Sequence, residues 1–145
     1  MNARVSPTAP ADHDPERARA ESLLSLACGA RVTLGHWQRL SGGAIQENIA
    51  VKAQVAAGPF AGTHDWVLRR DAPSTVAASH PRSHEFAILR AAHAAGVRVP
   101  EPLFVCEGDG GPAFFAMRRV PGLAAGHRLA KDDRLVPDRP RLARE

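Results

Sequence analysis

The chain has 145 residues, of which 44% are hydrophobic and 23% are charged, a balance that excludes wholesale disorder. No apolar run approaches the about 18 residues that a transmembrane helix needs, so we expect no membrane partner. The net charge of +4 raises nucleic acid as a partner, but the arginines are scattered among Asp and Glu, and tyrosine is absent. A nucleic-acid surface is typically a basic patch with stacking aromatic residues, so we do not expect nucleic acid.

The N-terminal part of the chain predicts a leader followed by a helix. Residues 1–14 show no apolar periodicity, which predicts a disordered leader. From Pro15 the sequence is rich in helix formers and ends at Gly29, a residue typical of helix C-termini. The expected apolar stripe of this helix consists of Leu23, Leu24, Ala27 and Cys28. Cys28 and Cys106 lack the CxxC spacing, so we expect two free thiols and a reducing compartment, the cytoplasm.

The next segment predicts an antiparallel meander of three strands. Val32–Leu40 alternates loosely and predicts the first strand, and Ser41-Gly42-Gly43 predicts a turn. Apolar residues then recur with a period of two from Ile49 to Val55, which indicates a half-buried strand. Asp65–Arg70 predicts the third. The short connections favour antiparallel pairing.

The second half of the chain predicts one helix and a hairpin. Apolar spacing indicates a helix from Arg82 to Ala95, with Pro81 at its start and Gly96 at its end. Two further strands are expected at Leu103–Glu107 and Ala113–Arg119, joined by a glycine-rich turn. The remaining residues, 123–145, are polar, and a helix could begin near Pro140.

This order of elements, three strands, a helix and a hairpin, is that of a protein-kinase-like small lobe. Four segments also resemble, in order, the aminoglycoside phosphotransferase and choline kinase-like superfamily. They are LSGGAIQEN (40–48), WVLRR (66–70), SHEFAILRAAHAAGVRVPEPL (83–103) and FFAMRRVPG (114–122). The resemblance covers roughly residues 31–125. It implies an α+β fold, a five-stranded antiparallel sheet with one main helix, helix C, and an additional N-terminal helix.

The same resemblance implies a division of the chain into three parts. The leader occupies residues 1–14, the nucleotide-binding small lobe residues 15–122, and a linker with the truncated start of a large lobe residues 123–145. The glycine-rich turn of the lobe is the segment Ser41, Gly42 and Gly43, and consecutive glycines let backbone N–H groups approach a phosphate. The same residues could equally form a plain hairpin turn. Gln46 stands near the place where the family often has asparagine.

The resemblance also implies a charged pair for the nucleotide phosphates. The cation is Arg69 on the third strand, and the carboxylate is Glu85 on the helix. Most kinases have lysine at this strand position, whereas arginine offers two parallel donors. Arg70 is the alternate cation, because strand alternation sends neighbouring side chains to opposite faces. Both arginines could also be ordinary surface residues.

The hinge segment is implied to bind adenine through backbone groups. The resemblance makes Met117 the gatekeeper, the carbonyl of Arg118 the acceptor and the N–H of Val120 the donor. Phe114, Phe115 and Met117 could also be ordinary core residues. The ligand expected at this site is ATP.

The catalytic motifs of the family are absent from this sequence. Its members supply an acceptor-positioning aspartate from a His-Gly-Asp motif and a later metal-binding aspartate, and neither motif follows Gly122. We therefore assign no catalytic residue and no metal ligand to this chain. We expect magnesium only in an intact parent protein that also contains the large lobe. The histidines show no spacing of a zinc site.

The function expected from these features is that of the ATP-binding lobe of a small-molecule phosphotransferase. The intact parent would transfer a phosphoryl group from ATP to a hydroxyl acceptor, and this fragment is expected to be inactive. The alternative is a non-enzymatic, degenerate kinase-like module for binding or regulation. A third reading, a basic nucleic-acid binder, predicts salt-dependent binding to DNA. The lobe face left exposed is also expected to favour self-association, through Leu103, Val105, Phe114 and Met117.

Overall fold

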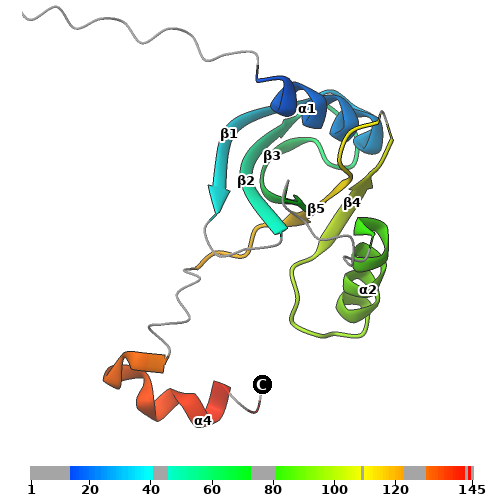
Figure 1. Ribbon diagram of the computed structural model, residues 1–145. Helices are drawn as coiled ribbons and strands as arrows, with labels where there is room; N and C mark the ends of the chain where they lie inside the picture. Colours follow the sequence, from blue (N-terminus) through cyan, green and yellow to red (C-terminus); the bar gives the residue numbers. More distant parts are fainter. Residues whose placement is uncertain are drawn as a thin grey trace, which may run out of the picture.

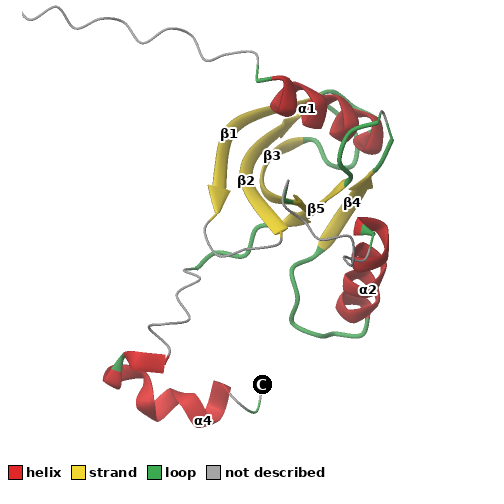
Figure 2. Ribbon diagram, in the orientation of Figure 1, coloured by secondary structure: helices red, strands yellow, loops and turns green. Residues whose placement is uncertain are grey.

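The computed structural model describes residues 14–40, 46–72, 81–108, 110–122, 130–142 and 144. These residues form an α+β lobe in which a curved sheet lies against two helices, as Figure 1 and Figure 2 show. The sheet has five strands in the order β1-β2-β3-β5-β4, and every neighbouring pair is antiparallel. The predicted kinase-like small lobe is therefore confirmed. The elements are α1 (Pro15–Cys28), β1 (Val32–Leu40), β2 (Gln46–Val55), β3 (Gly62–Asp71), α2 (Arg82–Ala94), β4 (Pro102–Cys106), β5 (Phe114–Arg118), η1 (Asp133–Asp138) and α4 (Arg139–Leu142).

Helix α1 begins and ends as its sequence predicts. The Asp14 carboxylate accepts a hydrogen bond from the Glu16 N–H at 3.1 Å, and Pro15 occupies the first helical position. Gly29 closes the helix in the left-handed region, with φ 66°, where a glycine costs least. Ala27, expected on the apolar stripe, is exposed instead. Ala20 and Leu24 are buried, because residues four apart lie on the same face of a helix and this face packs on the sheet.

Helix α1 packs against β1 and β4, the two edge strands of the sheet. It also satisfies the backbone of β1: the Val32 N–H donates to Ser25 Oγ at 2.9 Å, and the Leu34 N–H donates to Glu21 Oε1 at 2.6 Å. Covering an edge in this way removes unpaired donors that would otherwise invite a foreign strand. The helix therefore closes the curved sheet as well as its core.

The main core lies between α1 and the sheet. The predicted alternation in β2 is confirmed, since Lys52 and Gln54 are exposed while their neighbours are buried. Ala50 is buried too, because β2 is an interior strand. The core consists of Ala20, Leu24, Val32, Leu34, Ile49, Val51, Ala53, Val55, Trp66, Leu68, Cys106, Phe114 and Ala116.

The prediction that the Phe114 ring belongs to an exposed lobe face is wrong. The side chain is only 3% exposed, because β5 pairs Phe114 with Arg70 of β3 and Cys106 of β4, and this register turns the ring into the α1 core. Val105, by contrast, is exposed as expected. The predicted helix near Pro140 is present as α4. In the described part of the chain, no helix has the length and apolarity to cross a membrane.

Helix α2 packs on the other face of the sheet, against β4 and β5. The Phe86 ring lies 6.0 Å from that of Phe115, centroid to centroid. The predicted bounds of this helix are confirmed to within one residue, and Gly96 follows it with φ 82°. Ile88 on its outer side is 57% exposed, so α2 has only one covered side. This placement puts the first turn of α2 beside the end of β3.

Candidate functional site

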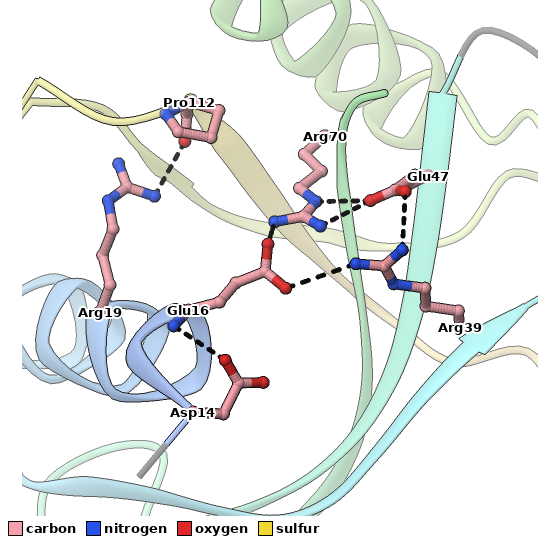
Figure 3. A network of polar contacts seen from close by, with 7 residues as sticks. All are labelled: Asp14, Glu16, Arg19, Arg39, Glu47, Arg70 and Pro112. Carbon is pink, nitrogen blue, oxygen red and sulfur yellow. Dashed lines mark hydrogen bonds and ion pairs between the residues drawn. The ribbon is translucent and has the colours of Figure 1, made fainter. Parts of the chain in front are cut away.

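Two neighbouring arginines of β3 face opposite sides of the sheet. Arg69 points toward α2, where it contacts Glu85, and Arg70 points toward α1, where it contacts Glu16 and Glu47. Figure 3 shows the second arrangement, with the Arg70 guanidinium between the two carboxylates. The predicted alternation of the two side chains is confirmed, and it gives the two arginines different partners on the two faces of the sheet.

The Arg69 guanidinium joins β3 to both β2 and α2. Its Nε lies 2.8 Å from Glu85 Oε1, which is the strand-to-helix pair that the sequence predicted. Its Nη1 donates to Asn48 Oδ1 at 3.4 Å, and its Nη2 donates to Gln46 Oε1. Asn48 and Arg69 stand directly opposite each other in the strand register. Arg69 therefore has one charged partner and two neutral amide partners.

A second arginine, which the sequence analysis missed, shares the Glu85 carboxylate. Arg82 at the start of α2 is only 2% exposed, and its Nη1 donates to Glu85 Oε2. Its Nε lies 3.3 Å from Asp71 Oδ1 at the end of β3. The spacing of three residues between Arg82 and Glu85 at a helix start is the signal that could have indicated this pair. Glu85 is thus fixed from two sides, and its carboxylate orients Arg69.

Arg70 is committed to the protein itself. Its Nε donates to Glu47 Oε2 at 2.9 Å, and its Nη1 donates to Glu16 Oε1. Burial lowers the pKa of the Arg70 guanidinium from its ordinary value, and the Asp14 carboxylate opposes that shift. A buried cation with two carboxylate partners is a structural ion pair rather than a cation available to a ligand. Arg69 is the stronger candidate for an anionic ligand.

The predicted hinge lies at the end of β5 and just beyond it. Met117 is half-buried and pairs with Val67 of β3 on the sheet face that carries Arg69. The Arg118 N–H donates to the Glu101 carbonyl at 2.9 Å, and Val120 is exposed. A surface hollow lined by Asp65, Arg119, Pro121 and Gly122 adjoins this segment.

Other predicted site residues divide between described and undescribed parts of the chain. Gln46 is described and contacts Arg69. Ser41, Gly42 and Gly43 lie outside the described residues, between β1 and β2. Among the described residues, no three His, Cys, Asp or Glu side chains gather as a metal site would require.

The chain was also compared with known protein families. A model of the phosphotransferase enzyme family matches residues 36–144, which is most of the chain. The chain belongs to the phosphotransferase enzyme family. The matched segment includes Arg69, Arg82, Glu85 and the predicted hinge, whereas α1 precedes it. No curated protein matches the chain.

Proposed function

We propose that the sheet face carrying Arg69 binds ATP, as the nucleotide-binding lobe of a small-molecule phosphotransferase. In the whole protein, the phosphoryl group of ATP would pass to a hydroxyl acceptor. The observation that carries the proposal is the Arg69–Glu85 pair, which joins the middle of the sheet to α2 at 2.8 Å. Membership of the phosphotransferase enzyme family supports the same reaction class.

Arg69 is suited to a phosphate because its amide partners are exchangeable. Gln46 and Asn48 are neutral acceptors, and a phosphate oxygen is a charged one. Hydrogen bonds to charged acceptors are roughly twice as strong as neutral ones, so the α- and β-phosphates can replace the amides. Glu85 stays paired with Arg82 during that exchange, which keeps its own charge compensated.

The remaining roles follow the chain around Arg69. Backbone N–H groups of Ser41, Gly42 and Gly43 would approach the phosphates, and the Gln46 amide released by Arg69 would donate to them. The adenine would lie against Met117, with the Arg118 carbonyl and the Val120 N–H as its hydrogen-bonding groups. The proposal assigns nucleotide binding to these residues. It assigns no catalytic residue and no magnesium ligand among residues 1–145.

The test is an ATP titration of wild type, Arg69→Ala and Arg31→Ala, followed by NMR so that weak binding is measurable. Arg31→Ala is the matched control, since it removes an exposed arginine that immediately precedes β1. Loss of a charge-assisted contact worth about 1.5–3 kcal/mol predicts that Arg69→Ala weakens ATP binding by about tenfold or more. Arg31→Ala should bind like wild type. Equal ATP affinity for wild type and Arg69→Ala would overturn the assignment.

A further inference from the structure

Four charged side chains on the α1 side of the sheet form a closed ring of alternating charge. Each arginine contacts both carboxylates: Arg39 lies 3.6 Å from Glu16 Oε2 and 3.2 Å from Glu47 Oε1, and Arg70 contacts the same two residues. Figure 3 shows the ring, with Glu16 rising from α1 between the two guanidinium groups. The ring is neutral as a whole.

The ring joins three strands and a helix at one place. Arg39 is the penultimate residue of β1, and Glu47 is the second residue of β2, so they stand on either side of residues 41–45. Arg70 lies opposite Glu47 on β3. Glu16 belongs to the first turn of α1. The ring therefore sets the separation of the two strand ends that carry the predicted glycine-rich turn.

The same strand end is held from the opposite face by the candidate site. Gln46 contacts Arg69, and its neighbour Glu47 contacts Arg70. A shift of β2 at this point would disturb both contacts together, because consecutive residues of a strand point to opposite faces. The ring on the α1 side and the phosphate-binding contacts on the α2 side are thus mechanically linked through two adjacent residues.

Glu16 is itself held firmly. Its N–H donates to the Asp14 carboxylate at 3.1 Å, which fixes the start of α1. One turn later, Arg19 Nη1 donates to the Pro112 carbonyl at 2.9 Å and ties the helix to the segment before β5. Glu16 precedes the segment that matches the phosphotransferase enzyme family, whereas the other three members of the ring lie within it.

We propose that Glu16 is a positioning residue for nucleotide binding, acting through Arg39 and Glu47 on the strand ends around residues 41–45. The inference rests on the proposed function and deepens it, because it adds α1 to the elements that determine phosphate affinity. Glu16 does not touch the nucleotide; the ring transmits its effect across the sheet.

The sign of the expected effect separates positioning from simple electrostatics. Removing a carboxylate reduces the repulsion of an anionic ligand, so Coulomb's law alone predicts tighter ATP binding for Glu16→Gln. Loss of positioning predicts weaker binding, by about twofold to thirtyfold, the usual range for residues coupled to a site without contacting it. Asp138→Asn is the matched control, because it removes a carboxylate from the exposed ion pair with Arg141.

The experiment titrates ATP and adenosine into wild type, Glu16→Gln, Arg39→Gln, the double variant and Asp138→Asn, and records each thermal midpoint. Arg39 is the most exposed member of the ring, so Arg39→Gln should fold even where Glu16→Gln is impaired. We expect ATP affinity to fall more than adenosine affinity in both single variants. We expect the double variant to lose less than the sum of the two, since both changes open the same ring.

Three results would overturn the inference. Unchanged or tighter ATP binding in both single variants, with Arg69→Ala still weakened, contradicts positioning but leaves the proposed function standing. Equal losses for ATP and adenosine that follow the thermal midpoint show a purely structural role. Absence of ATP binding by the wild type, or full affinity in Arg69→Ala, contradicts the proposed function itself and the inference with it.

Discussion

Arg69 and Arg70 are neighbours with the same side chain, yet the two faces of the sheet use them differently. The Arg70 side chain is 10% exposed and has two carboxylate partners, while the Arg69 side chain is 26% exposed and has one carboxylate and two amides. The α1 face thus satisfies its cation completely, and the α2 face leaves its cation with partners that a ligand can replace. Partner chemistry, more than residue type, therefore distinguishes the structural Arg70 from Arg69, the arginine proposed to bind ATP.

Arg70→Ala should show the largest effect on stability. It removes the buried cation between Glu16 and Glu47 and leaves only the more exposed Arg39 beside them. Two charge-assisted contacts are lost, at about 1.5–3 kcal/mol for a hydrogen bond to a charged group, so the cost should reach about 3 kcal/mol. Arg69→Ala should cost only about 1 kcal/mol, because Arg82 still compensates Glu85. Urea unfolding of both variants checks this order. Similar free energies of unfolding would contradict the distinction between the two faces.

The two helices offer the same comparison in apolar form. Leu24→Ala opens a cavity in the core under α1 and should cost about 2–5 kcal/mol. Ile88→Ala trims an exposed side chain on the outer side of α2 and should change the free energy of unfolding by less than about 0.5 kcal/mol. The measurement is again urea unfolding, and a large loss for Ile88→Ala would show that α2 is covered on both sides.

Much of this architecture was predictable from local patterns. The alternation from Ile49 to Val55 and the bounds of both long helices needed only residue spacing. The Arg69–Glu85 pair came from a resemblance, and the structure brings those two side chains together. The predicted exposure of Phe114 was wrong, because strand register decides which face of the sheet a side chain occupies, and register is not a local property.

The ring around Arg70 was not predictable, for the same reason. Glu16 and Arg70 are separated by 54 positions, and no spacing rule links a helix start to a strand end at that distance. Glu47 meets Arg70 only through the exact pairing of β2 with β3. Arg82 and Asp71 likewise meet only once α2 is packed beside β3.

Burial of the Cys106 thiol in the core beneath α1 should also make the stability of the protein depend on pH. Burial, together with the nearby Cys28 thiol, raises the pKa of Cys106 to about 12, while Arg19 opposes the shift. The folded protein therefore holds this proton more tightly than the unfolded chain, in which the thiol keeps its ordinary pKa of 9.0. The stabilisation is fully present below pH 9 and is lost as the pH rises toward 12, by about 1.4 kcal/mol per pH unit. Urea unfolding at pH 8.5 and 10.5 should show a smaller decline in Cys106→Ala, and equal declines would contradict the shift.

The smallest signal is expected for catalysis, because we predict no measurable turnover. The sequence contains no His-Gly-Asp motif, so we expect no ATP-dependent phosphorylation of an alcohol by the 145-residue chain. The measurement is release of ADP in the presence of magnesium and an aminoglycoside, choline or a sugar. Robust phosphorylation of any of these acceptors would contradict the assignment of binding without catalysis.

The most direct test of the central claim is a map of backbone amide shifts during an ATP titration of the wild-type chain. The account predicts saturable shifts at Gln46, Arg69, Met117 and Val120, the residues of the α2 face and the hinge, with much smaller shifts at Leu24 in the core beneath α1. An absence of saturable shifts, or shifts centred on the residues beneath α1, would contradict the assignment of the nucleotide to the Arg69 face.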